Sequence, residues 1–257
     1  MPEVTYKQVN GVGTITIDRP HARNAIALQT IDELEVALGE AETDKAAVLV
    51  LRGAGDRAFV SGGDLKELAE LRTARAAARM AMRMRRLLDR VAELPMPTIA
   101  ALNGHALGGG AETALACDLR LAADDVTVAF NHSQLAIMPA WGGVERLVDL
   151  VGRSQALRLL LTGDRIEMTE AKGLGLVDVV IPRANFESTC ETFARAVASV
   201  PAVVTRSIKA TVNAARPNSH SELERAAVDA FADLWVADAH WMAAEALNRT
   251  PRARTRK

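Results

Sequence analysis

Apolar and polar residues alternate with two different periodicities along the chain, and these patterns predict where strands and helices lie. Apolar positions recur at helical spacing over residues 27–43, where Ile31, Leu34 and Leu38 share one face. Short apolar runs typical of strands occupy residues 4–9, 12–17, 46–51, 98–102, 118–122 and 127–130. Strands that alternate with helices predict an α/β chain in which crossovers connect the strands.

The two ends of the chain differ in this pattern. Asn10-Gly11 separates the first two strand-like runs and is a strong signal for a β-hairpin. From about Arg153 onward almost every apolar position recurs at helical spacing. Helices are expected at 154–161, 169–174, 185–200 and 203–214, with two more between 219 and 248. We therefore expect a core over residues 1–200 that holds the site, and a helical cap or oligomerisation region over 201–257.

Composition narrows the class of protein. The 257 residues carry a formal net charge of −1 and are 49% hydrophobic, as in an ordinary globular protein, so no global field attracts nucleic acid or a membrane. No apolar run reaches spanning length, and the start MPEVTYKQVN lacks the segments of a signal peptide. A cytoplasmic protein is expected. Cys117 and Cys190 lack metal-ligand spacing, so both are interpreted as reduced structural cysteines, and no metal is implied.

Two glycine-rich segments each join a strand-like run to a helix. They are AFVSGGDLKEL at 58–68 and GHALGGGAETALACD at 104–118. The first amides of a helix have no intrahelical partner, so a glycine there lets a ligand oxygen approach them closely. Neither segment fits a dinucleotide or P-loop pattern. Two interpretations are open: both segments are tight turns, or together they supply two amides that converge on one carbonyl oxygen and form an oxyanion hole.

Four blocks of sequence carry a family resemblance. In chain order these are DRPHARNAI, FVSGGDLKEL, NGHALGGGAETALACDLRLAA and IMPAWGGVERL. Their order and spacing resemble the enoyl-CoA hydratase/isomerase, or crotonase, family over about residues 4–182. The resemblance implies an α/β fold, a spiral of repeated ββα units with a C-terminal helical region. It also implies an acyl-CoA substrate, assembly as a homotrimer or homohexamer, and no cofactor, since CoA is part of the substrate.

The resemblance also assigns roles to individual residues. It implies that Gly63 and Gly109 donate the two oxyanion-hole amides to the thioester carbonyl. Contacts with CoA, mostly through backbone atoms, would fall on Arg23, Ala25, Ser61, Asp64 and Leu65. Arg23 is equally consistent with a solvated loop charge.

The catalytic carboxylates decide which reaction such a protein performs. Hydratases of the family generally hold the reacting water between two glutamates, and Glu112 occupies the first of these positions. The block that usually supplies the second reads HSQLAIMP, which places His132 there. A histidine can act as general acid or base near neutral pH, so Glu112 with His132 could add water to a 2-enoyl-CoA. His105 is interpreted as structural.

The same residues leave a second reaction open. Decarboxylation of a malonyl-type thioester yields an enolate that needs only an oxyanion hole and one proton donor. Family members that decarboxylate methylmalonyl- or ethylmalonyl-CoA resemble this chain in keeping the first glutamate and replacing the second. The ethylmalonyl type also resembles it in the histidine and in P-x-W-G-G. Trp141 and Trp235 could shape the acyl pocket, although large aromatics usually serve the core.

A binding module is the third possibility. Arginines recur on one stripe of a predicted helix, and the tail PRARTRK adds positive charge. The stripe consists of Arg79, Arg83, Arg86 and Arg90. Such a surface could contact RNA, but no aromatic residues interleave to stack bases, so nucleic acid is not expected as a partner. The opposite face, with Met80, Met84 and Leu87, is expected to line the core or the acyl pocket.

Overall fold

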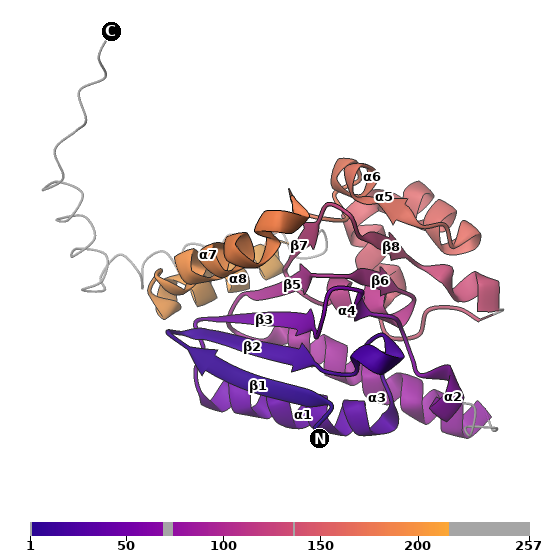
Figure 1. Ribbon diagram of the computed structural model, residues 1–257, viewed down its shortest axis with the longest axis horizontal. Coiled ribbons are helices and arrows are strands. Elements are labelled where there is room, and N and C mark those ends of the chain that lie inside the picture. The colour runs from indigo at the N-terminus through magenta and orange to yellow at the C-terminus, as the bar shows by residue number, and fades with distance from the viewer. Residues whose placement is uncertain (1, 69–73, 136, 216–257) are drawn as a thin grey trace, which may run out of the picture. The chain divides into compact units, whose positions relative to one another are not determined.

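The computed structural model describes residues 2–68, 74–135 and 137–215 (Figure 1). It divides into two compact units, residues 1–198 and 199–257. The described part of the second unit contains one helix, α8 (Ala202–Ala214), which begins one residue before the helix expected at 203–214. That the core holds the site, and that the C-terminal region is a cap or an oligomerisation region, stay predictions. The helices expected between 219 and 248, Trp235 and the basic tail lie outside the described residues.

The first unit is built on a six-stranded sheet. Its strands, in sheet order, are β1 (Val4–Val9), β2 (Val12–Ile17), β3 (Val48–Gly53), β5 (Thr98–Leu102), β7 (Leu119–Ala123) and β10 (Val179–Ile181). The β1–β2 pair is antiparallel, and Asn10 and Gly11 turn it with φ of 51° and 80°, as the hairpin signal predicts. All other neighbours are parallel, so helical crossovers are required between them.

A smaller, four-stranded sheet positions the chemistry. It runs in the order β4 (Ala58–Val60), β6 (His105–Leu107), β8 (Thr127–Ala129) and β9 (Ile166–Glu167). The first three strands are parallel. Their carboxyl ends therefore meet at one edge, the place where open α/β sheets bind ligands.

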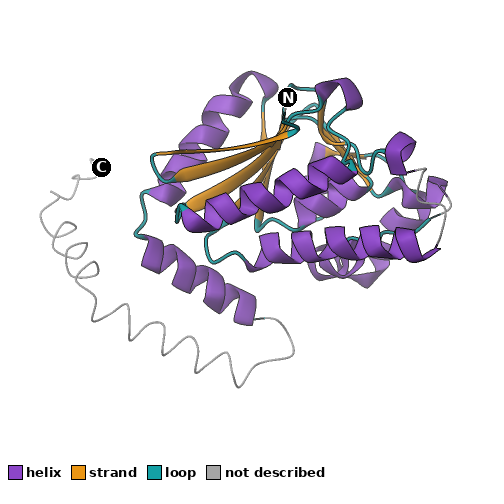
Figure 2. Cartoon of the chain, turned by 90° about the horizontal axis from the view of Figure 1, so that it is seen from below, coloured by secondary structure: helices purple, strands orange, loops and turns teal. Residues whose placement is uncertain are grey.

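Helices cover both faces of the larger sheet. Successive side chains of a strand point to opposite faces. Ile15, Leu49 and Leu51 pack with α1 (Leu28–Thr43) and α3 (Ala74–Glu93), which lie side by side in Figures 1 and 2, whereas Val12, Thr14 and Val50 face α7 (Phe186–Ala198). The remaining helices are α2 (Leu65–Leu68), α4 (Gly109–Leu115), α5 (Gly143–Thr162) and α6 (Met168–Gly173). Short 3-10 helices span Pro20–Ala22, Asn131–Leu135 and Arg183–Asn185.

The structure corrects the expectation that the chain after Arg153 is almost entirely helical. Strands β9 and β10 lie there, and with 2 and 3 residues they are too short to show a period. The helix expected at 154–161 is the second half of α5, which is kinked where Gly152 takes φ 75°. None of the helices in the described ranges has both the length and the apolar character that crossing a bilayer requires.

Candidate active site

Two glycine loops lie next to each other at the carboxyl ends of β4 and β6. Gly62 and Gly108 both take positive φ, 102° and 54°, conformations that L side chains rarely adopt. A Cβ added to Gly62 would lie 3.3 Å from the carbonyl oxygen of Leu107 and 3.4 Å from the amide nitrogen of Gly109. The two glycine-rich segments therefore meet, as their positions after parallel neighbouring strands require.

The amides of Gly63 and Gly109 both lack a hydrogen-bond acceptor among the residues that the structure describes. The N–H of Ile26 donates to the carbonyl of Gly62, and the carbonyl of Ile26 accepts from the amide of Asp64, each at 2.8 Å. These two bonds lie on either side of Gly63 and do not involve its N–H. Gly109 is the first residue of α4 and has no residue of its own helix to donate to. Within the described ranges neither N–H has a hydrogen-bond acceptor.

The indole of Trp141 lies against both glycines. A Cβ added to Gly109 would lie 2.1 Å from Cζ3 of Trp141, and one added to Gly63 would lie 3.8 Å from Cζ2. The six-membered part of the ring therefore reaches both backbone positions. No side chain fits at 109 unless Trp141 moves.

The Glu112 carboxylate is buried and held by backbone amides. Its side chain is only 1% exposed. Oε1 accepts hydrogen bonds from the amides of Trp141 at 2.8 Å and Gly143 at 3.0 Å. A Cβ at Gly143 would lie 2.4 Å from Glu112 Cγ, so glycine there permits the approach. The geometry fixes the carboxylate as a preorganised catalytic group requires.

The second oxygen of Glu112 faces His132. Oε2 lies 3.1 Å from Nε2 of this histidine, which is 8% exposed and follows β8 in a 3-10 helix. Nδ1 is buried and has no partner among the described residues. The strand order thus brings together the two side chains that the sequence proposes as an acid–base pair, although they are 20 residues apart. The pair can pass a proton between oxygen and nitrogen.

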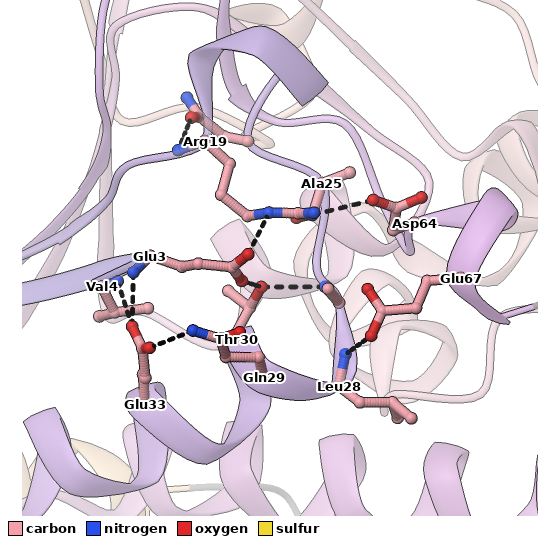
Figure 3. Close-up of polar contacts among 12 residues, drawn as sticks. Glu3, Val4, Arg19, Ala25, Leu28, Gln29, Thr30, Glu33, Asp64 and Glu67 are labelled. Atoms are coloured by element: carbon pink, nitrogen blue, oxygen red, sulfur yellow. Dashed lines mark hydrogen bonds and ion pairs between the residues drawn. The ribbon is translucent and has the colours of Figure 1, made fainter. Parts of the chain in front are cut away.

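An ion-pair network around the buried Arg19 holds the loop that carries Gly63 (Figure 3). Arg19 Nη1 donates to the carbonyl of Ala25 at 2.6 Å and to Asp64 Oδ2 at 3.0 Å, while its Nε lies 2.9 Å from Glu3 Oε1. Partial burial would raise the pKa of Asp64, but the hydrogen bonds from Arg19 and from the amides of Glu67 and Lys66 outweigh it and hold that pKa below its usual value.

A polar hollow of about 290 Å³ adjoins the two glycine loops. Ser61 and Leu107, which precede the glycines of each loop, both line it. Its wall also carries one histidine, two aspartates and four arginines. The arginines are Arg23, Arg57, Arg165 and Arg183. Arginine is suited to bind phosphate, so the hollow can accept an anionic group.

The other residues predicted to contact CoA differ in their hydrogen bonds and in their exposure. The backbone N–H of Ala25 donates to the carbonyl of Ala22, and its carbonyl accepts from Arg19. The carboxylate of Asp64 is engaged by Arg19, and Leu65 is 58% exposed. The assignment of these three residues to CoA, like that of Arg23 and Ser61, stays a prediction. His105 accepts a hydrogen bond from the Thr127 amide through Nδ1, in keeping with a structural role, and burial together with Arg165 lowers its pKa.

Three contributors to the site were not expected from the sequence. The amides of Trp141 and Gly143 orient Glu112, and Arg19 positions the Gly63 loop. These residues belong to the WGG and DRP segments of the blocks that carry the family resemblance. No periodic pattern in the sequence identifies them as part of a site. No group of three or more His, Cys, Asp or Glu able to hold a metal occurs in the part of the chain that the structure describes.

Comparison with known proteins identifies one family. The sequence profile of the enoyl-CoA hydratase/isomerase family matches residues 7–245. The chain belongs to this family. The crystal structure of enoyl-CoA hydratase from Bacillus anthracis superposes with a TM-score of 0.91 at 31% identity, covering 96% of each chain. The fold is therefore the crotonase fold, as the resemblance implies.

Relatives within the family differ in the reaction that they are named for. The short-chain-enoyl-CoA hydratase of Clostridium acetobutylicum is 34% identical over 82% of this chain and 80% of its own length. The ethylmalonyl-CoA decarboxylase of mouse is 32% identical over 89% of this chain and 72% of its own length. Family membership establishes an enzyme family, and the reaction has to be argued from the site.

Proposed function

We propose that the chain is an enoyl-CoA hydratase, which adds water reversibly across the double bond of a 2-enoyl-CoA. The observation that carries the proposal is the buried Glu112–His132 pair, 3.1 Å apart, beside the amides of Gly63 and Gly109, which have no acceptor among the described residues. A hydratase needs both parts, a group that moves protons and a site that holds negative charge on the thioester oxygen. The name of the C. acetobutylicum relative supports the same reaction.

The reaction uses each part once. Glu112 removes a proton from water while the water oxygen bonds to the third carbon of the acyl group. The electrons of the double bond move to the thioester oxygen, where the amides of Gly63 and Gly109 form the oxyanion hole. The proton held by the Glu112–His132 pair then passes to the second carbon. The thioester carbonyl re-forms, and both side chains return to their starting state.

Substrate binding follows from the hollow beside the loops. In the proposal the phosphates of CoA lie among its arginines, so Arg23 and Ser61 contribute to binding rather than to catalysis. Four arginines, Asp56 and Asp125 leave an excess of positive charge on the wall, which favours an anionic ligand.

The direct test is hydration of crotonyl-CoA, measured by loss of the absorbance of the conjugated thioester. Glu112→Gln keeps the shape of the side chain but cannot accept the proton, so we expect kcat to fall at least about a hundredfold. Circular dichroism and the melting temperature control for folding. A variant that folds normally and keeps the wild-type rate would remove Glu112 from the mechanism.

Decarboxylation of a methylmalonyl- or ethylmalonyl-type CoA thioester is the second candidate. The observation that favours it is that the pair contains a single carboxylate, since His132 stands where a second glutamate would complete a hydratase site. Loss of CO₂ leaves the electron pair as a thioester enolate that the two amides hold, and the Glu112–His132 pair then delivers one proton to the second carbon. The likeness to the mouse decarboxylase supports this alternative.

One comparison separates the two reactions. Wild type is assayed with crotonyl-CoA and with ethylmalonyl-CoA, and the products are identified by mass. Hydration with no release of CO₂ supports the hydratase, and release of CO₂ without hydration supports the decarboxylase. His132→Gln should impair whichever reaction occurs, because the imidazole that can pass a proton is lost, while a side chain able to form hydrogen bonds remains.

RNA binding has less support. Arg83 is paired with Asp32 at 2.5 Å and with Glu35 at 2.7 Å, and Arg90 pairs with Glu42 at 2.7 Å. These pairs neutralise two of the four arginines of the expected basic stripe. The opposite face of α3 packs into the core, as one of its predicted roles requires. A mobility-shift assay at physiological salt should therefore show no RNA complex.

We also propose a cytoplasmic homotrimer or homohexamer. Exposed apolar side chains support self-association, among them Leu157 at 42% and Leu161 at 72% on α5. Light scattering coupled to size exclusion measures the mass, and a monomer at micromolar concentration would contradict this part of the proposal.

A further inference from the structure

We propose that the Trp141 indole is the wall that limits the size of the acyl group. The inference rests on the proposed acyl-CoA chemistry and adds a specificity-determining residue to it. Trp141 would restrict the enzyme to short acyl groups, and its truncation would admit longer ones.

The position of the ring relative to the two amides carries the argument. A thioester oxygen bound by the amides of Gly63 and Gly109 lies about 2.9 Å from each nitrogen. The ring already comes within 2.1 Å of the Cβ position of Gly109 and within 3.8 Å of that of Gly63. The carbons attached to the carbonyl must therefore run along the six-membered part of the indole. Bulk on these carbons meets an aromatic surface and not open space.

The same segment places the wall opposite the reactive groups. The backbone N–H of Trp141 donates to Glu112 Oε1, and Glu112 Oε2 contacts His132. The second and third carbons of the acyl group must reach this pair to react. Ring and carboxylate are thus tied to one stretch of backbone, so the wall cannot retreat without disturbing Glu112.

The ring is also held from outside the site. Trp141 is 6% exposed, so it is packed on nearly all sides. Its carbonyl accepts a hydrogen bond from Arg146 at 3.2 Å, and Arg146 is itself paired with Asp89 at 2.6 Å. A packed indole lacks the freedom to swing aside for a longer chain, in contrast to an exposed flexible side chain.

The test measures binding and turnover over chain length in Trp141→Ala and Trp141→Phe. Binding uses butyryl-CoA and octanoyl-CoA, which are saturated and are not hydrated, and turnover uses crotonyl-CoA and 2-octenoyl-CoA. Wild type should prefer the four-carbon ligand. Trp141→Ala should shift the preference toward the eight-carbon ligand by about tenfold or more, because room for a single methylene in a pocket changes discrimination by about tenfold or more. Trp141→Phe should shift it by less, because it opens less space.

Two controls keep the outcome decisive. Leu38→Ala removes a fully buried apolar side chain from α1 and tests for general loosening of the core, so it should keep the wild-type preference. Trp141→Phe keeps an aromatic side chain should the alanine variant fail to fold. An unchanged preference in a folded Trp141 variant, or an equal shift in Leu38→Ala, would contradict the proposal that Trp141 limits the acyl group.

Failure of the wall and failure of the hydratase look different. The saturated ligands could show the expected binding preference, and its shift in Trp141→Ala, while crotonyl-CoA is not hydrated. In that case the role of Trp141 is supported and the hydratase proposal is wrong. If crotonyl-CoA is hydrated and the preference does not shift, the hydratase stands and the wall is wrong.

Discussion

The two glycine loops of the candidate site lie next to each other but are held in different ways. The loop at 61–64 is only partly buried at Gly63 and Asp64, and the ion pairs of Arg19 with Asp64 and Glu3 hold it. The loop at 108–112 is buried throughout, and close contact between backbones holds it. A Cβ at Gly110 would lie 1.8 Å from the carbonyl oxygen of Val60. One loop depends on electrostatics, and the other depends on the absence of side chains.

This difference determines which changes each loop tolerates. Backbone packed without a gap has no alternative arrangement, so a single added carbon forces a strand or helix to move. A charged network that loses one member lets the loop shift without moving a strand or helix, at a cost in stability. The sequence positions that cannot vary should therefore concentrate at 108–112, whereas the 61–64 loop should respond to pH and salt.

The largest effect is expected from Gly110→Ala. The added carbon meets backbone atoms of Val60 at 1.8 and 2.6 Å, so β4 or α4 must shift. We expect the free energy of unfolding to fall by about 4 kcal/mol or more, as for other severe overpacking. Urea denaturation measures this loss.

Gly173→Ala is the matched control. Gly173 also lies in a helix, α6, but a Cβ there would meet nothing within 4 Å. Alanine should therefore stabilise the protein by about 0.4–1 kcal/mol, by restricting the unfolded chain. Equal effects at the two positions would contradict the claim that contact, and not helix propensity, makes Gly110 indispensable.

Arg19→Met should have the next largest effect. It leaves Glu3 and Asp64 without their shared cation in a site where Arg19 is 8% exposed. We expect a loss of about 3 kcal/mol. Because the Gly63 amide is no longer held, kcat should also fall by about ten- to a hundredfold while KM changes less. A stability loss with wild-type kcat would show that Arg19 supports the fold only.

Asp64→Asn tests the electrostatic half of the comparison through pH. The pKa of Asp64 is lower in the folded protein than in the unfolded chain, so its contribution is fully present above the unfolded pKa and is lost as pH falls through the folded pKa. At pH 7 wild type should exceed the variant by about 2 kcal/mol. The difference should shrink below about pH 4, whereas the loss caused by Gly110→Ala should not change with pH.

Much of the fold could be predicted because its signals are local. The first hairpin follows from alternation around Asn10-Gly11, and β1 and β2 have the bounds that the pattern indicates. β6 was not predicted, since 3 residues beside glycines show no alternation. β9 was missed for the same reason, because two residues cannot display a period.

The site was predictable only in part because its contacts are remote in sequence. Glu112 and His132 were proposed from family blocks, and their 3.1 Å contact depends on the order of β6 and β8 in a sheet. Arg19 reaches Asp64 across 45 positions, which no spacing rule anticipates. Trp141 acts through its backbone N–H as well as its ring, and an amide donor leaves no mark in the residue type.

The smallest effect is expected at an exposed ion pair, Arg90–Glu42. It tests the comparison directly, because the same pairing of arginine with carboxylate lies at the surface instead of around the buried Arg19. Arg90 and Glu42 form a bidentate pair with distances of 2.7 and 2.9 Å, as short as those around Arg19. Their side chains are 38% and 39% exposed, so water screens the attraction. Glu42→Gln should cost at most about 1 kcal/mol, and less in 1 M salt. If it cost as much as Asp64→Asn, charge alone would explain the Gly63 loop, and burial would have no part in holding it.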